Sequence, residues 1–443
     1  MRQSDLNVDA LLDQSGVSRV QMNAFLLAAL AIVMDGFDGQ LIGYAIPTLL
    51  QEWQMSREEL APTLAIGLVG VGIGSALAGM LADRFGRRPA LVLSVLLFGL
   101  ATVGIGFATN LTNLTVLRFV AGLGIGGALP TATTLTAEFT PSRRRTMAIT
   151  ATIVCIPIGG MLSGLFSGLV LPQYGWRWLF YIGGGLSTAL ALLLWWVLPE
   201  SPRYLARFPK RVDQLRHMLR KMGHHIPAGA TFVDPSVQDS AQKAGVAGLF
   251  EGGLRRETVT LWLAFFMCLM TVYMSFSWLP TMLSHEGLSI GMASSGLAAF
   301  NLGGILGSIG CALMVTRFGS RVPMLIFCGG AAMSALLLLG VDVVGSTGLL
   351  IFGLGVNGMF TNAVQAILYP LCAYVYPTKV RATGTAMALV AGRLGTVVSA
   401  FAGAAVITFA GLTGYMMMLA IGMLLVLLAL LFTRKHIPAN FGR

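Results

Sequence analysis

Long apolar segments follow one another along this chain of 443 residues, and each is long enough to cross a lipid bilayer. A membrane-spanning helix needs about 20 mostly apolar residues. The segments that meet this length are 22–50, 61–81, 90–108, 112–137, 146–170, 177–198, 258–283, 289–315, 322–341, 347–375, 382–407 and 414–433. Only 11% of the residues are charged, against about 25% in soluble domains. The sequence therefore predicts an all-α membrane protein with twelve transmembrane helices.

The net charge of +11 comes from basic residues that gather in the two tails and in alternate loops. On the other side of the predicted membrane lie only Arg57 and Arg177, and Arg118 and Arg393 fall inside apolar segments. This asymmetry follows the positive-inside rule and predicts that both termini are cytoplasmic. The first residues are polar and do not look like a signal peptide. We expect a multi-pass protein of the cell (inner) membrane, with the lipid bilayer as partner and no nucleic acid.

A polar stretch at 199–257 divides the apolar segments into two sets of six. It predicts an N-terminal six-helix bundle at 1–198, a cytoplasmic linker, and a C-terminal six-helix bundle at 258–443. The two halves repeat each other, because GMLADRFGRRP at 79–89 is echoed by ALMVTRFGSRVP at 312–323. TPSRRRT is likewise echoed by PTKVRAT. Such repeats are typical of transporters whose pseudo-symmetric halves rock about a central site.

Four charged residues lie within the apolar segments: Asp35 and Asp38 in IVMDGFDGQLIG, Arg118, and Arg393. A charge at the bilayer centre costs about 2.5–3.5 kcal/mol on insertion scales. These side chains must therefore face a cavity or one another. At 1.5 Å per residue, Asp35 lies about 20 Å and Arg393 about 17 Å from the cytoplasmic ends of their segments. The two halves thus place an acid and a cation at similar depth.

The spacing of Asp35 and Asp38 puts both carboxyls on one helix face. Two like charges in a buried setting disfavour ionisation of both groups, which suits a proton carrier. The guanidinium of Arg393 suits bidentate binding of a carboxylate. The arrangement predicts a central site for an organic anion. The alternative is that Arg118 and Arg393 pair with buried acids and only hold the halves together.

Several motifs identify a resemblance. The loop GMLADRFGRR, the sequence from Arg118 to Gly126 with its spaced glycines, and LPESPRYL at 198–205 resemble the major facilitator superfamily. DGFD, GWRWLFYIGG at 175–184, FNLGGILG at 300–307 and GRLG at 392–395 resemble its aromatic acid:proton symporter family. The second-half loop departs from the pattern, with Thr316 where the first half has Asp83.

The resemblance implies a proton-coupled transporter that imports an aromatic carboxylate of hydroxybenzoate type by alternating access. Its partners would be the small aromatic acid and protons, and it would function as a monomer. A symporter of the same fold for a non-aromatic organic acid or a sugar-like solute is the alternative. The implied proton-coupling residues are Asp35, Asp38 and Arg118. The implied substrate-binding residues are Arg393, Phe37, Tyr44, Trp278, Phe300, Asn301, Asn357, Gln365 and Tyr369. The implied gating residues are Gly79, Asp83, Arg84, Gly86, Arg87 and Arg88.

Other readings of these residues stay open. Aromatic side chains in membrane helices often serve packing, and buried amides often bridge helices. The basic residues of the loop at 79–89 also act as inside-positive anchors. An enzyme is not expected, because the apolar segments hold no nucleophile–histidine pair or metal cluster, and we expect no cofactor and no metal. A signalling receptor would need a large cytoplasmic domain that neither tail provides.

Overall fold

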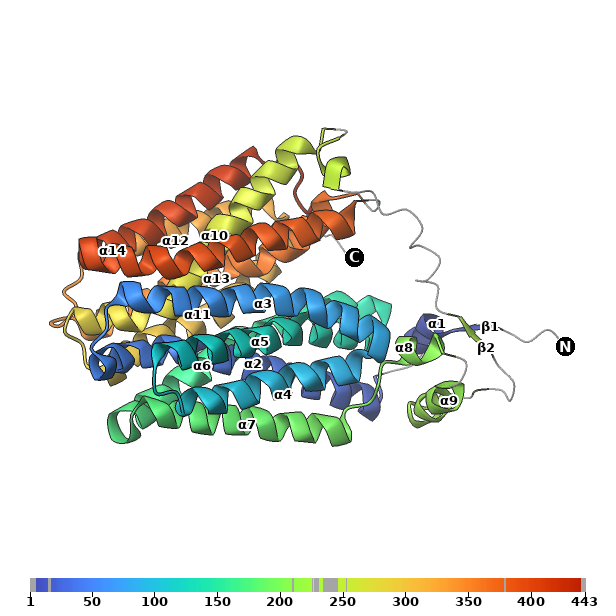
Figure 1. The fold of residues 1–443 in the computed structure, drawn as a ribbon. Helices are drawn as coiled ribbons and strands as arrows, with labels where there is room; N and C mark the ends of the chain where they lie inside the picture. The colour runs from blue at the N-terminus through green and yellow to red at the C-terminus, as the bar shows by residue number, and fades with distance from the viewer. Residues whose placement is uncertain are drawn as a thin grey trace.

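The computed structural model describes residues 5–14, 17–208, 211–224, 226, 231–233, 246–251, 253–377 and 380–439. Two bundles of long helices lie side by side (Figure 1). The first bundle contains α2 (Arg19–Trp53), α3 (Arg57–Phe85), α4 (Arg87–Gly106), α5 (Leu111–Phe139), α6 (Arg145–Tyr174) and α7 (Trp176–Val197). The second contains α10 (Arg255–His285), α11 (Ile290–Phe318), α12 (Arg321–Leu338), α13 (Thr347–Val375) and α14 (Arg381–Phe432). The predicted all-α fold of two bundles is confirmed.

The described part of the chain has 11 helices long and apolar enough to cross a membrane, because the last two predicted spans are joined in α14. Gly411 interrupts this helix with φ 54° and ψ −146°. Glycine reaches such a conformation without the steric cost that a Cβ would impose. The kink divides α14 into two segments, each of a length that crosses the bilayer. The count of twelve spans therefore agrees with the structure.

Both chain ends lie at one end of the bundles, at the right of Figure 1, and we call this the terminal end. A small layer covers the first bundle there. It consists of β1 (Asp5–Asn7), α1 (Val8–Gln14), α8 (Pro202–Ala206), α9 (Val212–Lys221) and β2 (Thr231–Val233), with β1 and β2 paired in parallel. Leu215 and Leu219 of α9 are buried in one cluster with Val8 and Leu12 of α1. The apolar face of α9 thus packs on protein. Lys210 and Lys379, two basic residues of the predicted cytoplasmic loops, lie outside the described residues.

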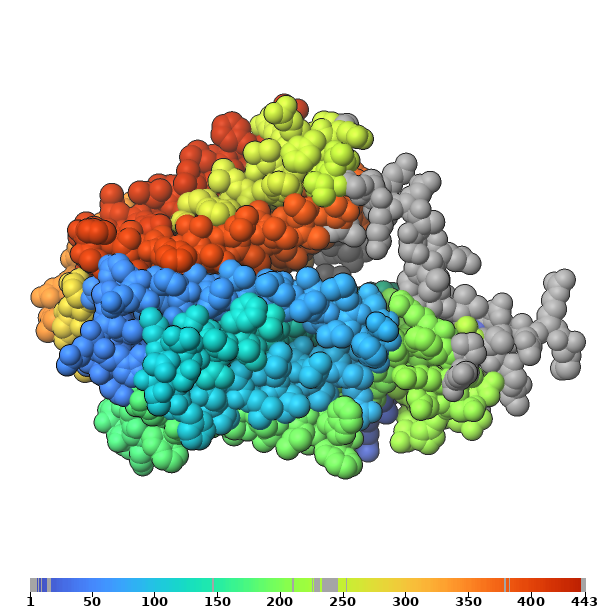
Figure 2. All heavy atoms as spheres, viewed as in Figure 1, coloured from blue at the N-terminus to red at the C-terminus, as the bar shows by residue number. Residues whose placement is uncertain are grey.

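The two bundles contact each other through α2 with α10, α3 with α14, and α6 with α11. Close approaches lie toward the end opposite the termini: a Cβ on Gly43 would collide with the carbonyl oxygen of Phe276. A Cβ on Gly164 would lie 2.7 Å from the Cβ of Ala298. In Figure 2 the bundles meet at the left and part toward the terminal end. The structure is therefore closed at the opposite end and opens toward the termini.

Candidate functional site

The segment DGFD lies in the middle of α2, where two glycines let the helix approach α6 backbone to backbone. A Cβ on Gly36 would collide with the carbonyl oxygen of Ile156, and one on Gly159 would collide with that of Val33. With no side chains between them, the two helices fix the direction in which α2 presents its polar face. Asp35 and Asp38 are 7% and 1% exposed.

Asp38 interacts with residues of the first bundle. Its Oδ2 accepts a hydrogen bond of 2.7 Å from Ser187 Oγ on α7. The buried Arg118 on α5 interacts electrostatically with Asp38. Among the residues that the structure describes, neither Asp38 Oδ1 nor Arg118 Nε has a hydrogen-bond partner. Buried polar atoms without partners are costly. Asp38 Oδ1 can therefore still accept a hydrogen bond or a proton, and Arg118 Nε can still donate a hydrogen bond.

Asp35 faces the second bundle. It interacts electrostatically with Arg393, in the part of α14 before the kink. Its Oδ1 has no hydrogen-bond partner within the described part of the chain. Arg393 Nη1 donates to the Tyr273 hydroxyl of α10 at 3.2 Å. Each of the two acids thus interacts electrostatically with one arginine. One pair lies inside the first bundle, and the other crosses between the bundles.

A cavity lies between the bundles at this level. Its polar lining consists of Asp35, Gln40, Arg118, Tyr273, Ser277 and Arg393. The rest of the wall is glycine and aliphatic side chains, with Phe276 as a further aromatic residue. A concave site with apolar walls and a few converging polar groups is the usual form of a small-molecule site. The charges present suit a small organic anion with an apolar body.

Other residues expected to bind substrate make contacts of their own. Tyr44 donates to the Gly160 carbonyl at 2.9 Å, and Trp278 donates to the Ala400 carbonyl at 3.1 Å. The amide of Asn357 donates to the Ala331 carbonyl at 2.9 Å. Each of these three side chains is bound to the backbone of another helix, and none of the three lines the cavity.

The remaining predicted aromatic residues pack edge-on or tilted against other rings. Phe37 lies 5.5 Å from Phe166, and Phe300 lies 6.1 Å from the cavity residue Phe276, both measured between ring centroids. Tyr369 packs at 5.6 Å on Phe265 and interacts electrostatically with Arg393. Tyr369 therefore lies near the arginine on its second-bundle side, and neither Tyr369 nor Gln365 lines the cavity.

Among the polar lining residues, Gln40 and Ser277 were not predicted, whereas Tyr273 was expected only as one of the aromatic residues that could hold a ring. Gln40 follows DGFD by two residues in the same apolar segment, so its polarity alone could have marked it. Ser277 is a small residue of a type common in membrane helices, and its sequence context gives no such signal.

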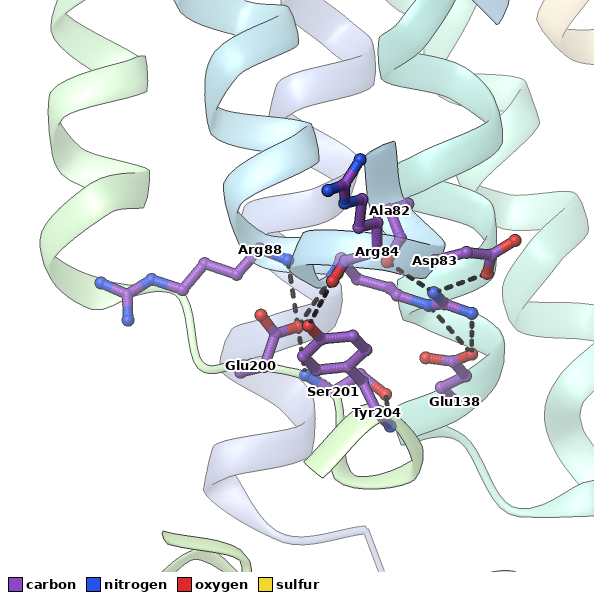
Figure 3. A network of polar contacts seen from close by, with 9 residues as sticks. Ala82, Asp83, Arg84, Arg88, Glu138, Glu200, Ser201 and Tyr204 are labelled. Carbon is purple, nitrogen blue, oxygen red and sulfur yellow. Dashed lines mark hydrogen bonds and ion pairs between the residues drawn. The ribbon is translucent and has the colours of Figure 1, made fainter. Parts of the chain in front are cut away.

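The loop at 79–89 forms a second polar cluster, at the terminal end (Figure 3). Arg87 is 5% exposed, and its guanidinium binds Asp83 at 2.9 Å and Glu138 at 3.2 Å. It also donates to the Ala82 carbonyl at 2.7 Å. The side chain of Asp83 is 70% exposed. Asp83 thus reaches into solvent while Arg87 holds α3, α4 and α5 together.

Glu200, from the LPESPRYL motif, closes this cluster. One oxygen accepts backbone N–H bonds from Arg87, Arg88 and Ser201 at 2.9, 3.1 and 2.8 Å. Burial raises the pKa of the Glu200 carboxyl, and these backbone donors oppose that shift. Gly86 has φ +115°, and a Cβ there would collide with the Glu200 carboxylate.

The other residues that the sequence predicted to act in gating have fewer contacts. The Arg84 guanidinium lies 5.3 Å from the centroid of the Phe85 ring, and the Arg84 carbonyl accepts from the Tyr204 hydroxyl at 3.0 Å. Arg88 donates to the Trp195 carbonyl. A Cβ on Gly79 would meet open space. The cluster thus fixes the loop to the linker and to α7.

The chain was compared with known proteins. A family model described as Major Facilitator Superfamily matches residues 28–355 and, in a second match, residues 261–442. The 4-hydroxybenzoate transporter PcaK of Pseudomonas putida is 37% identical over 403 residues, covering 90% of this chain and 89% of the relative. The gallate transporter of Pseudomonas putida is 34% identical over 438 residues, covering 98% and 93%.

Solved structures agree at the level of fold. The xylose transporter XylE from E. coli, in a partially occluded inward open conformation, superposes with a TM-score of 0.74 at 20% identity, covering 95% of this chain and 99% of that one. A D-xylose-proton symporter gives a TM-score of 0.72 at 19% identity, with the same coverage. The chain therefore belongs to the Major Facilitator Superfamily and to the aromatic acid transporter family within it, as its motifs predicted.

Proposed function

We propose that this protein imports an aromatic carboxylate of hydroxybenzoate type together with protons. The single observation that carries the proposal is the pair Asp35–Arg393, an acid and a cation from different bundles that share one cavity. Relatives named as transporters of 4-hydroxybenzoate and gallate support the substrate class. A solved neighbour named as a proton symporter supports the coupling to protons. The substrate leaves chemically unchanged, so the protein is not an enzyme.

Coupling follows from competition for Arg393. In the absence of substrate, the Asp35 carboxylate offsets the buried guanidinium, whose charge would otherwise be costly. A substrate carboxylate that binds Arg393 takes over this role with two charge-assisted hydrogen bonds. Asp35 then lies beside an anion in a low-dielectric cavity, which favours its protonation. Substrate binding and proton uptake therefore stabilise each other, and the loaded site carries no added net charge.

Asp38 and Arg118 provide the second half of the proton site. Asp38 lies within the first bundle, Arg118 lines the cavity, and the Ser187 hydroxyl holds the Asp38 carboxylate in place by a hydrogen bond. A proton on Asp35 can pass to Asp38 over one helical turn, because the residues lie on the same face of α2. Arg118 stabilises Asp38 when it is ionised.

The basic residues at the terminal end support a cytoplasmic location of both termini in the inner membrane, by the positive-inside rule. With that orientation, the cavity opens to the cytoplasm and the structure corresponds to an inward-facing state. One chain contains both bundles and every residue of the cavity, so the monomer is sufficient for transport.

The loop at 79–89 acts as the latch of the opposite, outward-facing state. Asp83 extends from α3 into solvent in the inward-facing structure. When the terminal ends close, it can meet the positive N-terminus of a helix of the second bundle. Arg87, Glu138 and Glu200 hold the latch rigid through the contacts described above.

Uptake into proteoliposomes tests the proposal. Labelled 4-hydroxybenzoate, gallate and xylose are offered with an inward proton gradient, with and without a protonophore. Gradient-driven accumulation of the aromatic acids that the protonophore abolishes is expected. Accumulation of xylose alone would replace the proposal with the sugar alternative. Uptake of the acids that is the same with and without the protonophore would disprove proton coupling.

A further inference from the structure

A reciprocal amide pair joins the two bundles beside the cavity. Gln40 Nε2 donates to Asn301 Oδ1 at 3.2 Å, and Asn301 Nδ2 donates to Gln40 Oε1 at 2.8 Å. Both side chains are buried, at 5% and 0% exposure. Gln40 lines the cavity, and Asn301, on α11, stands behind it.

The orientation of the Gln40 amide is fixed by its partner. Asn301 Nδ2 also donates to the Leu297 carbonyl at 3.0 Å, so both of its N–H groups are used. Its oxygen must then accept from Gln40 Nε2. A primary amide has two donors and two acceptor positions. The pair therefore leaves one N–H of Gln40 that can donate and one lone pair of its oxygen that can accept a further hydrogen bond.

The position of Gln40 is set by the rise of the helix. It follows Asp35 by five residues on α2, or about 7.5 Å along the axis. On α10, Ser277 follows Tyr273, the partner of Arg393, by four residues, or about 6 Å. Both helices run from the terminal end toward the opposite end. The cavity thus has a charged level at Arg393 and a neutral polar level at Gln40, separated by a distance comparable to the length of a 4-hydroxybenzoate.

We propose that Gln40, held by Asn301, reads a ring hydroxyl and makes the cavity selective for hydroxylated benzoates over benzoate. The inference rests on the proposed function and specifies its substrate. With the carboxylate on Arg393, the ring lies along the aliphatic wall and Phe276. A 4-hydroxyl group then reaches the level of Gln40, where it donates to the amide oxygen or accepts from the amide N–H.

The test is a binding ratio. Affinities of purified full-length protein in lipid nanodiscs are measured for 4-hydroxybenzoate and for benzoate. Gln40→Met keeps the length of the side chain but removes the amide. The dissociation constant of 4-hydroxybenzoate should rise about tenfold, the value of one neutral hydrogen bond, while that of benzoate changes less than threefold. Loss of the contact to Asn301 alters the balance of states for both ligands alike, so it leaves the ratio unchanged.

Gln21→Met is the matched control, because it makes the same exchange at another buried amide. Gln21 lies on the same helix, is 3% exposed and donates to the Phe139 carbonyl at 2.9 Å without lining the cavity. It should leave the ratio between the two ligands as in the wild type. An equal loss of both ligands in Gln40→Met would overturn the inference and leave transport of aromatic acids intact. Failure of the wild type to bind either acid would instead contradict the proposed function.

Discussion

Asp35 and Asp38 lie three residues apart on one helix, but the two carboxyl groups have different partners. Asp38 accepts a hydrogen bond from Ser187 and interacts electrostatically with Arg118 within the first bundle, whereas Asp35 shares the cavity with Arg393 of the second. A group that must respond to both substrate and proton has to touch the cavity. Asp35 meets that condition, and in the proposed mechanism Asp38 passes the proton on.

Arg393→Lys keeps the positive charge but loses the planar fork that binds a carboxylate at two points. Binding of a substrate carboxylate should weaken by about 1.5–3 kcal/mol, the value of a charged hydrogen bond. Isothermal titration of purified protein measures this, with the neutral amide analogue of the substrate as control. The wild type should bind the amide poorly, and the variant should bind it no worse. Equal losses for acid and amide would mean that Arg393 supports the fold and does not bind the anion.

The packing of whole helices fixes where these side chains lie. The glycines of α2 and α6 allow direct backbone contact and so set the rotation of the DGFD face. The same device recurs where a Cβ on Gly126 of α5 would collide with the Val71 carbonyl of α3. Small residues are common at interfaces of membrane helices for this reason.

Gly36→Ala should therefore destabilise the protein. Its Cβ would meet the Ile156 backbone, which cannot turn away as a side chain could, and overpacking of this kind costs about 1–3 kcal/mol. Gly39→Ala is the control, because a Cβ at Gly39 meets nothing within 4 Å. Thermal unfolding of the two variants in detergent compares them. Equal melting temperatures would show that the contact between α2 and α6 does not limit stability.

How much could be predicted from the sequence differs between elements. The spans, the repeat and the four buried charges follow from composition, since lipid tolerates few other arrangements. The kink at Gly411 was expected as a break between two spans, but the continuity of α14 was not. The partner of Gln40 could not be predicted, because Asn301 lies 261 residues away and an amide gives no sign of which helix it will face. For the same reason Arg87 was identified as a latch residue without its partner Glu138.

At the level of the molecule, we propose that groups at opposite ends of the bundles favour opposite states. The pair Gln40–Asn301 joins the bundles where they are closed in this structure. Asp83 is exposed at the end where they are open, and we propose that it contacts the second bundle when that end closes. A ligand or mutation shifts such an equilibrium only by its differential effect on the two states.

Asn301→Ala should thus shift the population toward the outward-facing state, and Asp83→Asn toward the inward-facing state. Labelling of single cysteines introduced near each end, on a background without the five native cysteines, measures the accessibility of both sides. Wild-type protein with the same reporter cysteines is the reference. Shifts in the same direction for the two variants, or none, would contradict the assignment of the two contacts.

The most direct test of the coupling at Asp35 is the number of protons taken up when substrate binds. Purified protein in weakly buffered solution near neutral pH receives 4-hydroxybenzoate in its ionised form, and the pH change is recorded. The wild type should take up protons in step with binding, because the substrate displaces Asp35 from Arg393. Asp35→Asn should bind the acid without proton uptake. Binding to wild type with no proton uptake, or an unchanged uptake in Asp35→Asn, would contradict the account.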